Sequence, residues 1–512
     1  MRQIRLVTGF LTVGVWTLFS RILGFVRDVF IAGYLGSGPV AEAFLIAFAL
    51  PNMFRRFFAE GAFNMAFVPM FSKKLEAGED ARGFAQNAFA GLGTLLIVFT
   101  LAGQLAMPWL VMAMAGGFLA DERFDMAVHF GRIAFPYILF VSLAALLSGV
   151  LNATGRFVAA AAAPTLLNLT FILSILLADL AGWPVGDALS WAVPLAGIAQ
   201  LVMVWVAAKR AGFALRIAWP RLTPEIRRLA VIAAPAMLAG GVVQINLLVG
   251  RQVGSFFEGA IAWLAYADRL YQLPLGVVGI AIGVVLLPDL SRRLRAEDTD
   301  GGRHSFNRAA EFALALSVPS AVGLVVIATP IVSVLFERGA FTESDTAATA
   351  LAVAVYGLGL PAFVLQKVLQ PLYFAREDTR SPFRFAVVAM VVNAVVAVGL
   401  APFIGYIAAA IATSLAGWAM VWQLWRGARG MGAATDLDAR FMTRIWRILI
   451  AAAFMGACLL GAEALLSEML EARRLRILAL VLLVVAGAVS YFGLGALIGA
   501  FRLADFRSAI RR

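Results

Sequence analysis

Basic side chains interrupt some of the most apolar stretches of the sequence. The first stretch contains FSRILGFVRD, with Arg21, Arg27 and Asp28. A later one contains YADRLYQLP, with Asp268 and Arg269. If these stretches cross a bilayer, each arginine costs about 2.5–3.5 kcal/mol on insertion scales and must face a partner or a water-filled cavity. Because the planar guanidinium matches phosphate oxygens two at a time, the residues indicate an anion site that suits a phosphate or diphosphate.

Two further apolar stretches carry charges of the same kind. The stretch AEAFLIAFALPNMFRRFFAEG holds Glu42, Arg55 and Arg56, with Pro51 breaking the run before the arginines. The stretch PAFVLQKVLQP holds Lys367 as its only charge. For Arg56 and Lys367 the alternative is a structural ion pair or an interfacial position, in which a long side chain reaches the membrane surface. For Arg55 we favour a contact with the anion.

Helical geometry and two asparagines complete the candidate set. At 3.6 residues per turn, Arg21 and Asp28 lie on nearly one face, whereas Arg27 is displaced by about 120° from Arg21. Asn168 and Asn393 occupy equivalent positions of an internal repeat described below. They can coordinate an ion or bond between helices, and helix packing is the favoured interpretation.

The composition of the chain indicates the class of protein in which these residues lie. Of the 512 residues, 62% are hydrophobic and 14% are charged, and the mean hydropathy is +0.89. Soluble globular proteins are about 45–50% apolar and about 25% charged, so a water-soluble enzyme is excluded. Cys458 is the single cysteine and there are two histidines, which excludes a cysteine-cluster or histidine-based metal site. No pattern typical of a catalytic triad, a carboxylate pair or a phosphate-binding loop is present, so we predict no metal, no cofactor and no enzymatic activity.

The apolar runs predict an all-α polytopic membrane protein with about fourteen transmembrane helices, since roughly 20 apolar residues cross a bilayer. Arg21 lies in the first of these expected helices. The expected spans are 6–33, 40–70, 84–112, 126–150, 157–179, 184–208, 229–252, 259–289, 306–335, 346–372, 383–402, 405–425, 444–466 and 476–501.

Charge distribution gives the expected orientation. The net charge is +12, from 42 basic and 30 acidic residues. Most of the basic residues fall in the termini and in every second loop, beginning with the loop that holds Lys73 and Lys74. Cytoplasmic loops carry such an excess of Lys and Arg, so both termini are expected in the cytoplasm. The excess of basic residues is therefore explained by the orientation of the chain in the membrane, and no nucleic-acid partner is expected.

A tandem repeat divides the spans. Pro69, Ser72 and Leu75 recur 219 residues later, at Pro288, Ser291 and Leu294. Pro136, Thr154 and Asn168 recur 225 residues later, at Pro361, Thr379 and Asn393. Six is an even number, so two six-span halves have the same orientation and are related by an axis along the membrane normal. We expect lobes at 1–220 and 221–430, followed by two additional helices at 431–512.

The motifs SRILGFVRD, AEAFLIAFALPNMFRRFFAEGAFNMAFVP, YADRLYQLPLGVVGIAIGVVLLPDLS and APTLLN resemble those of the MurJ (MviN) family. Its members are lipid II flippases of the multidrug/oligosaccharidyl-lipid/polysaccharide exporter superfamily. The resemblance implies two six-helix lobes around a central cavity and two C-terminal helices that form a groove for the polyprenyl tail. It also implies a location in the bacterial inner membrane and a place in cell-wall synthesis, whose proteins are candidate partners.

The resemblance also implies roles for single residues. The family's essential cavity arginines match Arg21, Arg27, Arg55 and Arg269, and its cavity acids and lysine match Glu42, Asp268 and Lys367. Gln272 stands where some members carry a glutamate, which puts a charge role there in doubt. The sodium site of some members has no acid here, with only Gln244 and Asn246 in the seventh span, so sodium coupling is not carried over.

Three other functions compete with lipid II transport. A drug or polysaccharide exporter of the same superfamily would handle a different substrate, and a drug exporter for cations would expose carboxylates in its cavity. An integral-membrane enzyme for polyprenyl phosphates would need Asp, His or Ser clustered at one interface, which the sequence lacks. A non-transporting scaffold for cell-wall assembly remains open.

Overall fold

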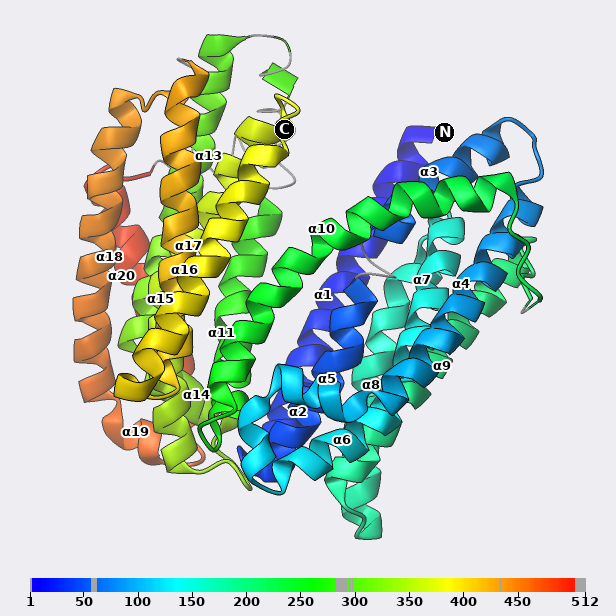
Figure 1. The fold of residues 1–512 in the computed structure, drawn as a ribbon. Helices are drawn as coiled ribbons and strands as arrows, with labels where there is room; N and C mark the ends of the chain where they lie inside the picture. Colours follow the sequence, from blue (N-terminus) through cyan, green and yellow to red (C-terminus); the bar gives the residue numbers. More distant parts are fainter. Residues whose placement is uncertain are drawn as a thin grey trace. The chain divides into compact units, whose positions relative to one another are not determined.

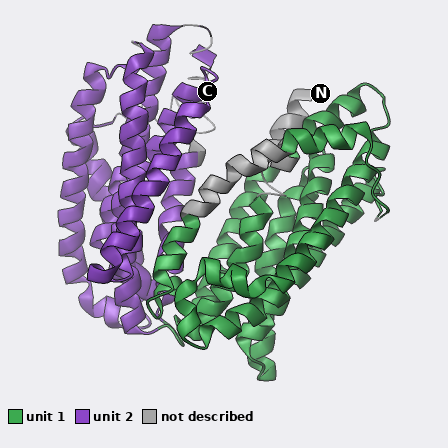
Figure 2. Ribbon diagram, in the orientation of Figure 1, with its two compact units in different colours: residues 1–262, 338–341 green, residues 263–337, 342–512 purple. Residues whose placement is uncertain are grey.

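A computed structural model gives the fold, and all its elements in the described part of the chain are helices (Figure 1). The chain forms two compact units, which Figure 2 colours separately. Unit 1 comprises residues 1–262 and 338–341, and unit 2 comprises residues 263–337 and 342–512. The structure describes residues 2–56, 62–216, 218–281, 292–293, 296, 298–432 and 435–501.

Unit 1 contains ten α-helices and one short 3-10 helix among the described residues. They are α1 (Arg2–Leu35), α2 (Pro39–Arg55), α3 (Ala62–Glu76), α4 (Ala81–Leu105), α5 (Met107–Met114), η2 (Gly116–Ala120), α6 (Arg123–Ala134), α7 (Tyr137–Ala153), α8 (Val158–Ala181), α9 (Val185–Arg210) and α10 (Pro224–Gly254).

Large aromatic side chains fill the interior of unit 1. Phe67 of α3 stacks on Phe84 of α4, with ring centroids 5.6 Å apart, and Phe44 of α2 packs on Phe171 of α8 at 5.9 Å. All four rings are nearly or completely buried. Since each buried aromatic removes a large apolar area from its surroundings, these contacts fix the positions of the helices that carry the candidate residues.

Unit 2 begins within the first turn of α11 (Ala260–Ala281). Its α15 starts with a capping box, in which the Thr342 side chain accepts from the Asp345 backbone and the Asp345 carboxylate accepts from the Thr342 backbone. The other described helices are α13 (Thr299–Val326), α14 (Ala328–Phe336), α15 (Glu343–Phe374), α16 (Arg380–Ile404), α17 (Ile407–Ala428), η4 (Arg429–Met431), α18 (Ala439–Leu465), α19 (Ser467–Glu471) and α20 (Arg476–Leu497).

The same pairing of helices occurs in both units. In unit 1, α9 packs against α7 and α8, and in unit 2, α17 packs against α15 and α16. The repeat at an offset of 225 relates α7 to α15 and α8 to α16. Polar side chains support the packing in unit 2, where Ser414 donates to the Val355 carbonyl at 2.8 Å and Tyr373 to the Leu424 carbonyl at 2.6 Å.

Several expected spans are interrupted rather than continuous. The span expected at 84–112 divides into α4 and α5 at Ala106, and the one at 306–335 divides into α13 and α14 at Ile327. The span at 126–150 divides into α6 and α7 beside Pro136. Proline is tolerated in the first turn of a helix, because the amide it lacks has no partner there. Apolar residues run through each break, so hydropathy does not reveal it.

Ten of the described helical segments are long and apolar enough to cross a membrane. Four expected spans fall on α1, α2 with α3, α10 and α11, which are not among the ten. Three of these four carry the charges singled out above, namely Arg21, Arg27, Arg55 and Arg269. The chain is an all-α polytopic membrane protein, and fourteen spans remain a prediction.

Candidate functional site

Arg27 is the most completely enclosed of the predicted anion-binding residues. It lies on α1, is 5% exposed, and donates from Nε and Nη2 to one carboxylate oxygen of Asp28, at 3.0 and 2.7 Å. Its Nη1 donates to Oδ1 of Asn168 on α8, at 3.0 Å. Asp28, which was expected to share a helical face with Arg21, pairs with the adjacent Arg27. A guanidinium this buried needs such partners, since an isolated buried charge is very costly.

Asn168 connects this arginine to the backbone of α1. Its amide nitrogen donates to the Ser20 carbonyl at 2.9 Å, while its oxygen accepts from Arg27. The rings of Phe48 and Phe171 lie 5.9 and 5.5 Å from the guanidinium carbon. Amide and aromatic contacts together fix the plane of the guanidinium. Asn168 therefore packs α1 against α8, as the favoured interpretation proposed, and also holds Arg27.

The other arginines of unit 1 differ in exposure. Arg21 is exposed, about two turns before Arg27 on α1, and this difference agrees with the angular displacement between them. Arg55 is half-buried at the end of α2, and Arg56, its neighbour, is exposed. Unit 1 thus carries three of the four arginines, and Arg269 lies on α11 in unit 2.

Glu42 is completely buried in an ion-pair network of unit 1. One carboxylate oxygen accepts from Nη1 of Arg123 at 2.7 Å, and the other accepts from the backbone amide of Ile261 at 2.9 Å. Arg123 also donates from Nη2 to Asp121 at 2.6 Å and lies 4.4 Å from the centre of the Phe118 ring. Both carboxylate oxygens of Glu42 therefore accept hydrogen bonds from within the protein, and these bonds link α2, α6 and the start of α11.

Asp121 shows the electrostatic effect of this network on a loop residue. The hydrogen bond from the Arg123 side chain lowers the pKa of the Asp121 carboxyl below its ordinary value, against the opposing effect of partial burial. A hydrogen bond to the charged form of a carboxyl favours ionisation. Asp121 is therefore ionised near neutral pH. Its carboxylate orients the Arg123 side chain toward Glu42.

In unit 2, Asp268 is the centre of a polar cluster on α11. Gln272, one turn later, donates its amide to the Asp268 carboxylate, and the Tyr271 hydroxyl also bonds to Asp268. The Tyr271 ring lies 5.0 Å from Tyr356 and 5.6 Å from Phe363, both on α15. The polar cluster therefore adjoins a group of aromatic rings that packs α11 against α15.

Arg269 and Lys367 are the exposed cations of unit 2 among the predicted residues. Lys367 on α15 reaches Gly279 on α11, where a Cβ atom would lie 2.5 Å from Nζ. Glycine therefore permits this close approach of the ammonium group. Asn393 on α16 is 2% exposed.

Three interacting residues were missed by the sequence interpretation. They are Arg123, Tyr271 and Glu311. Glu311 is 6% exposed and lies close to three arginines of unit 2. An acid within an expected span was the signal that could have identified it.

Metal ligands do not gather in the described part of the chain. No three His, Cys, Asp or Glu side chains there lie close enough together to hold an ion. Gln244 and Asn246 fall on α10, but their side chains lie outside the described residues.

Comparison with known proteins gives consistent matches along the chain. A family model described as lipid II flippase MurJ matches residues 31–480. The chain is 45% identical to a probable lipid II flippase MurJ of Rhizobium meliloti (strain 1021), over 99% of this chain and 96% of that protein. It is 35% identical to a probable lipid II flippase MurJ of Vibrio cholerae serotype O1, over 99% and 98%.

Solved structures agree with the sequence relatives. A structure described as lipid II flippase MurJ in an inward closed conformation has a TM-score of 0.79 and 25% identity, over 95% of this chain and 98% of that one. An inward-facing multidrug transporter of the MATE family has a TM-score of 0.67 at 12% identity, over 82% and 96%, which shows a common fold.

Proposed function

The chain belongs to the MurJ family of lipid II flippases, and from this premise we propose that it carries lipid II from the cytoplasmic to the outer leaflet. It is a multi-pass protein of the bacterial inner membrane and a transporter rather than an enzyme. Lipid II joins a polyprenyl tail to a disaccharide-pentapeptide through a diphosphate. Its head group cannot cross hydrocarbon unaided, because charges and polar groups lose their hydration there.

The cavity arginines are proposed to bind the diphosphate. Arg21 is exposed on α1, and the contacts of Arg27 with Asp28 and Asn168 hold a second guanidinium in a fixed plane on the same helix. Arg269 is exposed on α11. Guanidinium groups replace water around phosphate oxygens with paired, directional hydrogen bonds. The enclosed Arg27 on a family motif is the observation that carries this proposal.

The remaining predicted residues divide between direct and indirect roles. Lys367, Arg55 and Arg56 are proposed as further contacts for the anionic head group. Glu42 and Asp28 are proposed to act through Arg123 and Arg27, which they contact. Asp268 and Gln272 are proposed to orient one another beside Arg269, and Asn393 to serve helix packing.

Transport is proposed to proceed by alternating access, with the lobes 1–220 and 221–430 rocking about the substrate. The two helices expected at 431–512 are proposed to form a groove that guides the polyprenyl tail while it stays in the lipid bilayer. If both termini are cytoplasmic, two negative charges move from the negative inside of the membrane to its positive outside. At 100 mV this movement is favoured by roughly 4–5 kcal/mol, so the potential supplies part of the direction.

The test is flipping of fluorescent lipid II by the purified protein in liposomes. Arg269→Ala is expected to abolish flipping while insertion and folding persist. Arg156→Ala is the matched control, because Arg156 is exposed in the loop between α7 and α8. A scaffold would show no flipping by the wild type. An exporter for another substrate would flip that lipid or drug and leave lipid II in place.

A further inference from the structure

Four residues between α14 and α15 pack with unit 1, although both helices belong to unit 2. They are residues 338–341, and we call them the strap. The backbone amide of Ala340 in the strap donates to the carbonyl of Gly33, in the last turn of α1, at 2.8 Å. The chain therefore leaves unit 2 to form a backbone hydrogen bond within unit 1, and it re-enters unit 2 at Thr342.

Glycine is required at two points of this contact. At Gly36, which directly follows α1 with a φ of +61°, a Cβ atom would overlap the carbonyl oxygen of Ala340. At Gly339, with a φ of +60°, a Cβ atom would overlap the carbonyl oxygen of Gly33. Residues with a side chain rarely adopt a positive φ, and here they would also collide with backbone atoms. The backbones of the strap and of α1 thus touch directly.

The strap and the end of α1 are each anchored by other contacts. In the last turn of α1, the Tyr34 hydroxyl donates to the Asp179 carboxylate on α8 at 3.1 Å. Phe341 is 2% exposed, although the three strap residues before it are exposed. The capping box of Thr342 and Asp345 then begins α15. Because both sides are fixed in this way, the contact between them can form and break as a unit.

The expected topology places this contact at the outer face of the membrane. The first expected span ends at residue 33 and the ninth at residue 335, and odd-numbered spans end outside when the N-terminus is cytoplasmic. In the expected repeat, α1 belongs to the lobe 1–220 and the strap to the lobe 221–430. Rocking of the lobes that opens the outer face must therefore separate the strap from α1.

We propose that the strap is a releasable latch. Docked on Gly33 and Gly36, it keeps the outer face closed while the substrate enters from the cytoplasm, and it detaches when the protein opens to the outer leaflet. This inference rests on the proposed transport of lipid II and adds the contact that holds one of its two conformations. The strap acts on the conformation of the protein, whereas the diphosphate is left to the arginines described above.

A disulfide between the strap and α1 tests the latch. A Cβ atom at Gly33 would lie 3.2 Å from Cγ of Arg338, and the Sγ of a cysteine would take the place of that Cγ. The double variant Gly33→Cys/Arg338→Cys can therefore form a disulfide, with an S–S bond of about 2.05 Å. It is made in the full chain with Cys458→Ser, which removes the single native cysteine.

Oxidation of the double variant with copper phenanthroline should abolish flipping of fluorescent lipid II in liposomes, and dithiothreitol should restore it. The single variants Gly33→Cys and Arg338→Cys, each with Cys458→Ser, are the matched controls. They meet the same reagents but form no bond between the strap and α1, so oxidation should leave their flipping unchanged. Flipping by the oxidised double variant at the rate of the reduced form would overturn the proposal.

Hydrogen–deuterium exchange of the Ala340 amide gives a second readout, which needs no lipid II. This amide is bonded to the Gly33 carbonyl, so its exchange rate measures detachment of the strap. Gly33→Leu places a branched side chain against the strap and should speed the exchange about tenfold. Gly33→Ala is the milder variant if the leucine folds poorly, and it should speed the exchange by a smaller factor. An unchanged rate in both folded variants would contradict the latch.

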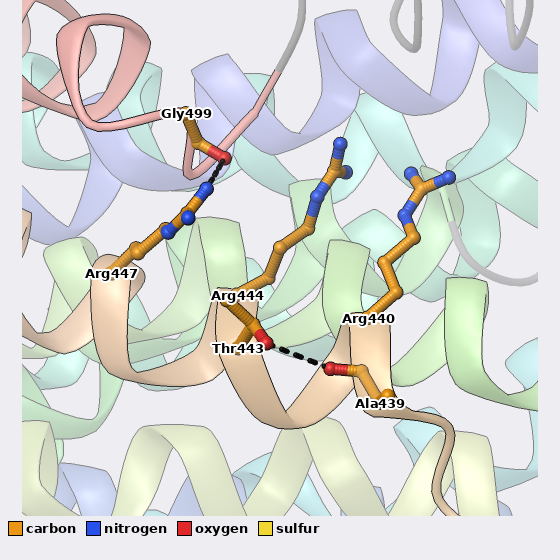
Figure 3. A pocket seen from close by; sticks show the side chains of 6 residues that line it. All are labelled: Ala439, Arg440, Thr443, Arg444, Arg447 and Gly499. Atoms are coloured by element: carbon orange, nitrogen blue, oxygen red, sulfur yellow. Dashed lines mark hydrogen bonds between the residues drawn. The ribbon is translucent and has the colours of Figure 1, made fainter.

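Two control variants separate the strap from general effects on the helices. Gly399→Leu makes the same substitution on α16, where nothing lies within 4 Å of the new Cβ atom. Arg447→Gln removes a contact between an arginine and a glycine elsewhere, the bond from Nη1 to the Gly499 carbonyl at 3.1 Å (Figure 3). Neither variant should change the exchange rate of the Ala340 amide. A rise in either control equal to that in Gly33→Leu would overturn the assignment to the strap.

The two readouts distinguish failure of the latch from failure of the proposed function. If neither the wild type nor the reduced double variant flips lipid II, the proposed function fails and exchange alone decides the latch. Slower exchange of the Ala340 amide in the oxidised form than in the reduced form would support the latch. Equal exchange in the two forms would show that the strap does not detach, which would overturn it.

Discussion

Arg27 and Asn168 are joined by a hydrogen bond of 3.0 Å between helices α1 and α8, although 141 residues separate them in the chain. The same amide donates to the Ser20 carbonyl on α1. A single asparagine thereby links two helices and orients a buried guanidinium. This relationship explains how a costly charge is kept within an apolar unit and why its geometry is fixed before any substrate arrives.

Replacing Asn168 with alanine should therefore both destabilise the protein and slow flipping. A buried donor that loses its acceptor costs about 1–3 kcal/mol, which should lower the thermal unfolding temperature in detergent. Asn152→Ala is the control, since Asn152 is exposed near the end of α7. If Asn168→Ala unfolds and flips lipid II like the control, Asn168 does not position Arg27.

The buried pair of Glu42 and Arg123 should be non-additive on mutation. Glu42→Leu removes the carboxylate that accepts from Arg123 and leaves a buried cation, at a cost of about 3–5 kcal/mol. Glu42→Leu/Arg123→Met removes both charges and should recover much of that loss. Thermal unfolding of the two single variants and the double variant measures the coupling. Additive losses would contradict the pairing.

Gly279→Ala tests the approach of Lys367 to α11. The new Cβ would lie 2.5 Å from Nζ of Lys367, and a flexible side chain can move away at little cost in stability. We expect nearly unchanged unfolding but reduced flipping if Lys367 contacts the head group from this position. In a Lys367→Ala background, Gly279→Ala should have no further effect on flipping. A further loss there would mean that the alanine acts through helix packing.

Asp121 should make stability depend on pH in the acidic range. Its pKa is lowered in the folded state by Arg123, so its contribution is complete above the ordinary Asp pKa of about 3.9 and is lost as pH falls through the lower folded value. Asp121→Asn should reduce stability at pH 7, and its difference from the wild type should shrink below pH 4. A difference that stays constant between pH 7 and pH 3 would show that ionisation of Asp121 is irrelevant.

Features that depend on residues close together in the sequence could be predicted. The expected span 157–179 corresponds to α8 (Val158–Ala181), and 383–402 corresponds to α16 (Arg380–Ile404). Continuous apolar residues define each of these helices, so hydropathy finds them. The break at Ala106 is invisible to the same argument, because the residues on both sides of it are equally apolar.

Contacts between distant residues could not be predicted. Glu42 was expected to face a cavity, and its contact with Arg123 depends on how α2 and α6 pack. The pair formed by Glu311 and Arg444 joins helices 133 residues apart. Sequence spacing fixes which side chains share a helical face, but the partner on another helix follows only from the tertiary fold.

The central claim is that the arginines recognise the diphosphate, and affinity measured for paired ligands tests it most directly. The dissociation constants of lipid II and of a phosphate-free analogue should be determined for the wild type, Arg269→Ala and the control Arg156→Ala. We predict that Arg269→Ala weakens lipid II binding by at least tenfold and leaves binding of the analogue unchanged, so that the loss depends on the diphosphate. An equal loss of affinity for both ligands would contradict the account.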